Sequence, residues 1–198
     1  MKHLTKTIKY ILKSELTNVN NIPIRGYYIG DRARVFRSPY IIIDPGTENI
    51  DWMTIRYTTN EVRLDIYGYV QAAMMSDMDI VESLSFLSMD LGKELKNTMM
   101  NHIQFYIFTP SEIDGREFYS PQFLVDEYGL TVLEYYNQYP GTAQNPSVRY
   151  LYDGRVSDVD YLTVKKEGTF LRASKISCFW KFATPITQIG PDTVGYEY

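Results

Sequence analysis

Few residues in this chain of 198 could carry out chemistry. Histidine occurs only as His3 and His102, and His102 has no second histidine at ligand spacing, so no zinc site is indicated. The single cysteine, Cys178, lies in an apolar stretch with no cationic group in register to activate it, and such thiols are normally inert. One cysteine cannot form an internal disulfide, which indicates a reducing compartment or simply a buried thiol. We therefore expect no metal, no cofactor and no catalytic nucleophile.

Carboxylates and glycines form no catalytic motif either. Asp77 and Asp79 form one Asp-x-Asp pair and Asp158 and Asp160 another, but neither has the glycine and terminal glutamate of a calcium loop. We interpret the pairs as a helix cap and a solvated loop. There is no Gly-x-Ser-x-Gly elbow and no phosphate-binding glycine loop with its lysine. An enzyme site assembled from scattered carboxylates and tyrosines stays open, but the sequence nominates no member of it.

Arginine is concentrated near the start of the chain. Four of the ten arginines fall within 13 residues. Arginine makes bidentate contacts with carboxylates and phosphates, so this segment predicts contact either with acidic groups of a neighbouring subunit or with DNA phosphate. The four arginines are Arg25, Arg32, Arg34 and Arg37.

Tyrosine is unusually frequent, with 18 residues, and many of them fall in residues 97–164, where lysine is absent. Tyrosine enrichment with lysine depletion is typical of buried interface patches; a tyrosine-rich core is the alternative. Because residues 110–147 have the composition of loops, which bury little, we favour the interface. The candidates are Tyr119, Tyr128, Tyr135 and Tyr136.

The net charge of −4 hides a strong asymmetry along the chain. Residues 1–40 carry a net +6, residues 41–96 and 97–164 a net −6 each, and residues 165–198 a net +2. A basic start and an acidic middle could bind each other, a second copy or two different partners. We expect the arginine segment to meet acidic groups of the next subunit, with these targets: Glu112, Asp114, Glu117, Asp126 and Glu127.

Apolar periodicity predicts two helices. Residues 3–17 form an amphipathic pattern, with a lysine stripe that is either solvated or a surface for acidic protein or phosphate. Residues 79–101 form a longer pattern of about 35 Å, interrupted by Gly92 at a cost of about 1 kcal/mol. This second helix also carries apolar residues opposite its main stripe, which are either stray surface hydrophobes or a partner contact: Phe86, Met89 and Met100.

Strand signals occupy much of the remaining chain. The alternation at residues 61–70 predicts a half-buried strand, and the long helix must bury its stripe against such a sheet. We expect an α+β fold, a mixed and mainly antiparallel sheet with both helices on one face. Strands are expected at 26–29, 32–36, 40–43, 52–58, 61–70, 103–108, 130–136, 163–164 and 170–182, with turns at 44–46, 59–60 and 167–168.

The domain organisation expected from these patterns is one α+β domain over residues 1–182 with a loop-rich insertion at about 110–160. Residues 183–198 read as a C-terminal arm. No run approaches 18 apolar residues, so no membrane span is expected. The lysine-interrupted N-terminus lacks the apolar region of a secretory signal.

The order of these elements resembles that of the tail-terminator proteins of long-tailed bacteriophages, also called tail-completion or neck proteins. The likeness covers residues 3–108 and, weakly, 163–182. It rests on an N-terminal helix, a basic extended segment, an aromatic followed by aliphatics at residues 40–43, an alternating strand at 61–70 and a long helix after it. The chain departs from the family in its 110–160 insertion and its C-terminal arm.

The resemblance implies a small structural virion subunit without catalytic residues. It would form a homo-oligomeric ring, commonly a hexamer, at the head-proximal end of the tail tube. The ring would stop tube growth, dock to head connector proteins and let DNA pass through its lumen, with assembly in the host cytoplasm. Another phage assembly protein, such as a head-completion, connector or baseplate component, is the alternative, and an enzyme is a more distant one.

Overall fold

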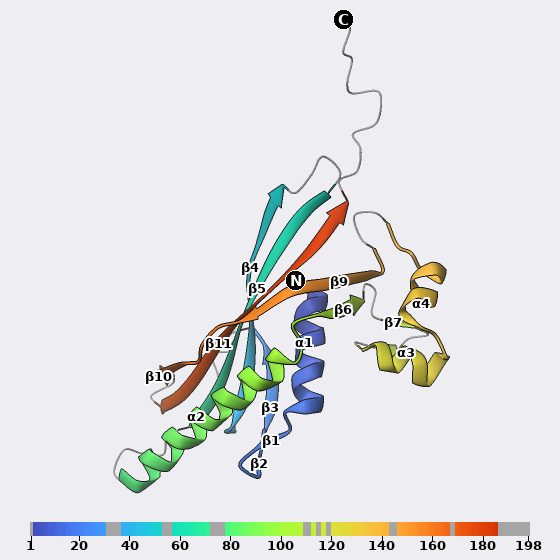
Figure 1. Cartoon of the computed structure of the whole chain (residues 1–198). Helices are drawn as coiled ribbons and strands as arrows, with labels where there is room; N and C mark the ends of the chain where they lie inside the picture. Colours follow the sequence, from blue (N-terminus) through green and yellow to red (C-terminus); the bar gives the residue numbers. More distant parts are fainter. Residues whose placement is uncertain are drawn as a thin grey trace, which may run out of the picture.

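The computed structural model is an α+β fold in which helices pack on a large curled and mainly antiparallel sheet (Figure 1). This confirms the fold class expected from the sequence. The residues that the structure describes are 2–30, 37–52, 57–71, 78–108, 112–113, 116–117, 120–142, 146–166 and 169–185.

The helices and strands follow each other along the chain with few long connections. The helices are α1 (Lys2–Glu15), α2 (Met78–Met100), α3 (Pro121–Tyr128) and α4 (Val132–Gln138). The strands are β1 (Asn18–Val19), β2 (Ile22–Pro23), β3 (Gly26–Ile29), β4 (Tyr40–Trp52), β5 (Tyr57–Gln71), β6 (Phe105–Phe108), β7 (Glu112–Ile113), β8 (Arg116–Glu117), β9 (Val148–Val156), β10 (Asp160–Lys166) and β11 (Thr169–Pro185).

The main sheet has the strand order β3-β4-β5-β11-β9-β6. Only β3 and β4 pair in parallel among the described strands; the other pairs are antiparallel. One edge of β11 pairs with β5 along 15 residues, from Leu171 to Pro185. The other edge is shared, because β10 pairs with the start of β11 and β9 with its later half. At about 3.3 Å per residue, β11 extends over roughly 50 Å, so its two ends serve different parts of the molecule.

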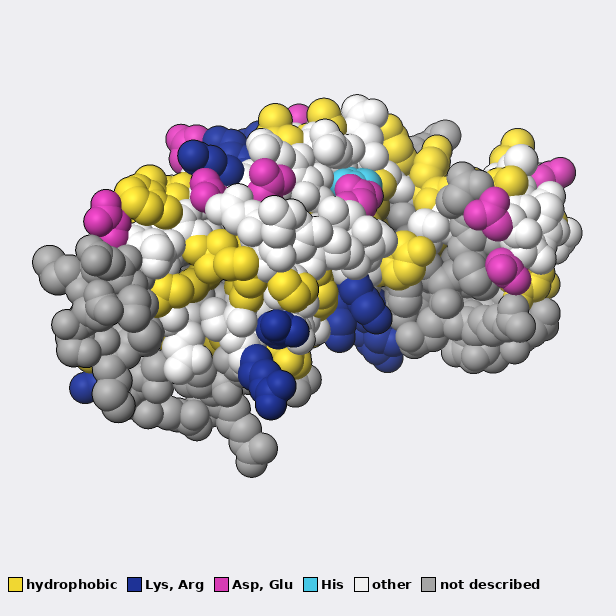
Figure 2. Space-filling view, turned by 90° about the horizontal axis from the view of Figure 1, so that it is seen from below, with side chains coloured by type: hydrophobic (Ala, Val, Ile, Leu, Met, Phe, Trp, Pro, Cys, Tyr) yellow, Lys and Arg dark blue, Asp and Glu magenta, His cyan; other side chains and the backbone are white. Residues whose placement is uncertain are grey.

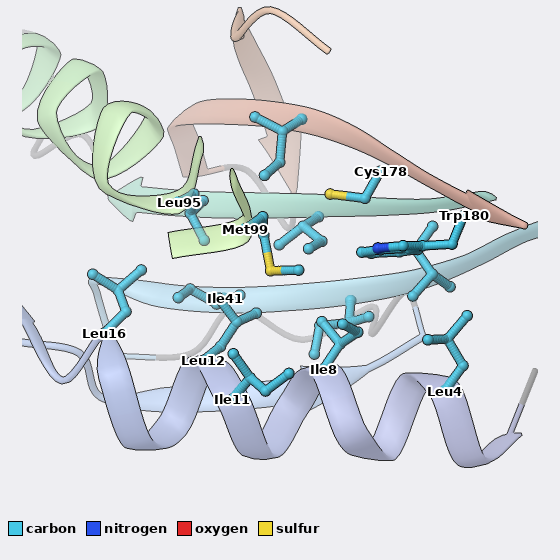
Figure 3. Packing of buried hydrophobic residues seen from close by; sticks show 14 of the residues in the cluster. Leu4, Ile8, Ile11, Leu12, Leu16, Ile41, Leu95, Met99, Cys178 and Trp180 are labelled. Carbon is cyan, nitrogen blue, oxygen red and sulfur yellow. The ribbon is translucent and has the colours of Figure 1, made fainter. Parts of the chain in front are cut away.

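Both long helices cover the same face of this sheet and share one hydrophobic core (Figure 3). The apolar stripe of α1, including Ile8 and Leu12, faces Ile41 of β4, and Leu95 and Met99 of α2 reach the same layer. Trp180 is buried there, and its Nε1 donates a hydrogen bond to the carbonyl oxygen of His102 at 3.0 Å. The apolar residues of α1, which recur with the period of a helix, therefore pack against strand residues that face the core at every second position.

Small residues let α2 approach the centre of the sheet. A Cβ atom on Gly92 would lie 2.6 Å from Val159 Cγ1 and 2.9 Å from Ser174 Cβ, and one on Gly68 would lie 2.6 Å from Leu91 Cδ2. The glycine inside the helix therefore has a packing reason. It removes the side chain at the point where α2 crosses β5 and β11.

Two turns expected from the sequence are wrong. Asp44-Pro45-Gly46 does not reverse the chain but lies inside β4, where the register with β5 shifts between Pro45 and Glu48. The residues that favour a turn therefore form a bulge, in which β4 has extra residues relative to β5. Thr59 and Asn60 lie inside β5, paired on one side with β4 and on the other with β11.

The insertion at about 110–160 is more regular than expected, since it contains α3, α4 and β9. The strand expected at 130–136 is wrong, because residues from Val132 onward form α4. Thr131 caps this helix: its Oγ1 accepts from the backbone N–H of Glu134, and its own backbone N–H donates to Glu134 Oε2. The helices α3 and α4, which we call the α3–α4 lobe, lie beside β6 and β9, away from the main helical layer (Figure 1).

Candidate interface surfaces

The outward side of α2 carries exposed apolar side chains. Phe86 is 56% exposed, Met89 40% and Met100 48%. Phe86 and Met89 are three residues apart and share one helix face, whereas Met100 lies about 16 Å beyond Met89 along the axis. The structure thus brings the first two candidates together and separates the third. Whether any of them contacts a partner remains a prediction.

A shallow groove of about 220 Å³ lies beside Met89, between α2 and strands β10 and β11. Tyr161 Oη donates to the carbonyl oxygen of Met89 at 3.4 Å, and Arg172 Nη1 donates to Thr163 Oγ1 at 2.5 Å. Ser88 lies in the groove wall and is 3% exposed, and its Oγ has no hydrogen-bond partner among the described residues. The volume is below the roughly 300–1,000 Å³ of small-molecule sites, so the groove fits one or two side chains rather than a cofactor.

Strand β10 forms the outer rim of this groove. Within the described chain it pairs with β11 alone, so its second edge carries unpaired backbone groups. The register places Tyr161 opposite Ser174 and Thr163 opposite Arg172, on the side of the sheet that faces α2. Tyr161 and Phe170 are exposed, and Lys165 Nζ lies 5.6 Å above the Phe170 ring. With Phe86 and Met89, these residues form a mixed apolar and cationic surface, which we call the α2–β10 surface.

Two of the four candidate arginines can be located. Arg25 and Arg37 are both exposed, and the backbone N–H of Arg25 donates to the carbonyl oxygen of Pro39 at 2.7 Å. The parallel pairing of β3 with β4 therefore brings both arginines to the end of the sheet where β4 begins. Arg32 and Arg34 lie outside the described residues.

The tyrosine candidates divide into core and surface. Tyr135 is 1% exposed and packs edge-on against Phe108, with ring centroids 5.7 Å apart, so in this chain it belongs to the core rather than to the surface. Tyr128 is half-buried and packs against the same small core, while Tyr136 is 41% exposed. Because consecutive helical residues point about 100° apart, neighbouring tyrosines on α4 face opposite environments. Tyr119 lies outside the described residues.

The α3–α4 lobe presents acidic side chains. Asp126 and Glu127 are exposed on α3, and no lysine or arginine occurs between residues 117 and 148. Figure 2 shows acidic side chains on this lobe, at the right of the view, and hydrophobic side chains reaching the surface over the main body. The other expected acidic targets, at 112, 114 and 117, have no described side chains.

The face of the sheet away from the helices holds a charged cluster that the sequence did not reveal. Asp65 accepts hydrogen bonds from Arg63 at 3.1 Å, Ser177 at 2.6 Å and Lys175 at 3.0 Å. Burial raises the pKa of Asp65, but these donors outweigh it and hold the pKa below its usual value. The donors occupy the acceptor positions of the carboxylate, so the cluster braces β5 against β11 rather than offering a free base. The i, i+2 spacing of Arg63 with Asp65, and of Lys175 with Ser177, is the signal that could have indicated it.

The remaining chemical candidates have structural positions. Cys178 is fully buried and burial raises the pKa of its thiol well above the usual range; His102 Nε2 lies 2.8 Å from Glu15 Oε1 and joins α1 to the end of α2. In the part of the chain that the structure describes, no three His, Cys, Asp or Glu side chains gather to hold a metal ion. None of the helices with described residues has the length and apolarity to cross a membrane.

No protein-family model matches the chain, and no curated protein sequence matches it.

Proposed function

We propose that the chain is a structural subunit that forms a closed ring at the head-proximal end of a phage tail. One observation carries the proposal: the molecule has two unlike surfaces at opposite ends of β11. The α2–β10 surface lies at the start of the strand. At its far end β11 pairs with β5, which pairs in turn with β4 (Figure 1).

The far end is a three-stranded arm. Residues 58–60 of β5 pair with β4 on one side, and residues 57–60 pair with residues 182–185 of β11 on the other. The outer part of β4 is exposed, including Ile50 at 69%. A contact between unlike surfaces is heterologous, and heterologous contacts close into rings when the rotation permits. The family resemblance of the sequence supports the same assembly.

Charge supports a defined orientation of neighbouring subunits. Exposed Arg25 and Arg37 lie at the end of the sheet where β4 begins, and the acidic α3–α4 lobe lies apart from them, beside β6 and β9 (Figure 1). Exposed ion pairs contribute only about 0–1 kcal/mol each, so charges would set register and association rate. The apolar contacts would supply most of the affinity.

The ring would terminate the tail tube and dock to the head connector, in the virion. The test is to image particles made without this protein. Tails of uncontrolled length, or tails and filled heads that stay separate, support the proposal. Normal particles would contradict it, and a defect confined to the heads or the baseplate would favour another phage assembly role.

The arginines decide between a subunit contact and a lumen that touches DNA. The double variant Arg25→Glu with Arg37→Glu should impair ring formation if these side chains meet the next subunit. Normal rings in particles that lose DNA would instead assign them to the channel. Lys13→Glu, an exposed charge reversal on α1, is the control.

A further inference from the structure

We propose that the open edge of β10 and the groove beneath it receive residues 186–198 of a neighbouring copy as an added β-strand. This inference rests on the proposed function and names the segment that joins one subunit to the next. An edge strand with free backbone groups is a template for such pairing.

The receptor side has both parts that strand addition needs. The backbone edge is β10, whose residues 160–163 are all exposed and which pairs with β11 alone among described strands. Side-chain specificity would come from the groove between β10 and α2, where Met89 and Tyr161 supply apolar walls and Arg172 a cation. The buried Ser88 hydroxyl has no partner in the part of the chain that the structure describes, so it offers a further polar contact to an entering segment.

The composition of residues 186–198 matches this receptor. The segment contains Asp192 and Glu197 and no lysine, arginine or histidine, which complements Arg172 and the nearby Lys165. Val194, Tyr196 and Tyr198 alternate with other residues, the period of a strand with one apolar face. Valine and tyrosine also favour strands intrinsically.

Geometry favours a neighbour over the same chain as the donor. The described part of β11 ends at Pro185, ten residues beyond Lys175, which pairs with the near end of β10. At about 3.3 Å per residue, returning along the strand would use roughly ten of the residues 186–198 that form the proposed segment. About three residues would be left for pairing, too few for a stable strand. A second copy can present the whole segment.

The decisive experiment mixes two variants of the full chain that each lack one half of the contact. The receptor variant is Met89→Asp with Arg172→Glu, and the donor variant is Val194→Asp with Tyr196→Asp. Each alone should associate at least tenfold more weakly than the wild type by analytical ultracentrifugation. An equimolar mixture should give one-to-one pairs, since one intact groove and one intact segment remain. Pair formation also shows that both variants are folded.

Hydrogen exchange provides the second readout. Backbone amides of β10 should exchange more slowly in the assembled wild type than in the donor variant. Rings that form normally with the donor variant, or a mixture that stays monomeric, would overturn this inference while leaving the ring proposal intact. A wild-type chain that is monomeric at every concentration would remove both.

Discussion

The two long helices of this protein differ in how far the chain itself completes their burial. The stripe of α1 is covered by the sheet: Leu4, Ile8, Leu12 and Leu16 are all at most 3% exposed. The first half of α2 and the neighbouring β10 leave Phe86, Met89 and Tyr161 more than a third exposed beside a groove. The first region is a finished core. The second is a surface on which apolar side chains and unpaired backbone groups occur together, as expected where another chain completes the packing.

Truncating a fully buried apolar side chain of α1 should have the largest effect on stability. Leu12→Ala should lower the free energy of unfolding by about 2–5 kcal/mol, because Leu12 is fully buried and a cavity remains. Urea denaturation measures this loss. A loss below about 1 kcal/mol would mean that the packing of α1 against the sheet is not a complete core.

Filling the crossing point of α2 should come next. Gly92→Val should destabilise the protein by about 1–3 kcal/mol, since its side chain would collide with Val159 and Ser174. Lys93→Val, the next residue and exposed, is the matched control and should change stability by no more than about 0.5 kcal/mol. Equal effects of the two substitutions would show that α2 does not press on the sheet at Gly92.

The brace on the open face of the sheet predicts a pH dependence. Asp65→Asn should cost about 1–3 kcal/mol at pH 7, because it removes charged hydrogen bonds. The folded pKa of Asp65 is lowered, so its contribution is present above the unfolded value of about 4 and is lost as pH falls through the folded pKa. The difference in free energy of unfolding between the wild type and the variant should therefore become smaller in acid, as measured by denaturation at several pH values. Asp153→Asn, whose carboxylate is exposed beside Lys181, should show a smaller effect.

Substitutions on the α2–β10 surface should change the association of subunits rather than the free energy of unfolding. Phe86→Ser should change the free energy of unfolding by no more than about 0.5 kcal/mol. If Phe86 is buried between subunits, losing roughly 1.5–3 kcal/mol of burial should weaken association about ten- to hundredfold in sedimentation experiments. Ile22→Ser, a comparably exposed apolar change on β2, should leave association unaltered. A Phe86→Ser chain that unfolds would instead place Phe86 in the core.

The sequence predicted the core between the long helices and the sheet well, because buried apolar residues recur in it with the periods of a helix and a strand. Both long helices were placed within one or two residues of their ends, and the sheet, its alternating β5 and the burial of Cys178 followed from the same patterns. The capping box at Thr131 and Glu134 is present in the sequence as Thr-x-x-Glu, although a strand was expected over residues 130–136.

The surfaces were harder to predict because they depend on pairing register. Tyr135 and Tyr136 are identical in type, and only the position of α4 against Phe108 buries one of them. The Asp65 cluster needs β5 opposite β11, with Asp65 beside Ser177. The groove needs β10 on the outer edge of β11 and α2 above it, which no local pattern specifies.

Native mass spectrometry of the purified full chain shows whether successive copies close into a ring. A single closed assembly with a fixed number of 23.1 kDa subunits, dissociating to folded monomers without intermediate-sized open chains, is the predicted result. A monomer at all concentrations, or a symmetric dimer that forms no larger assembly, would contradict ring formation. A contact between two unlike surfaces joins each copy to the next, so it does not stop at a symmetric dimer.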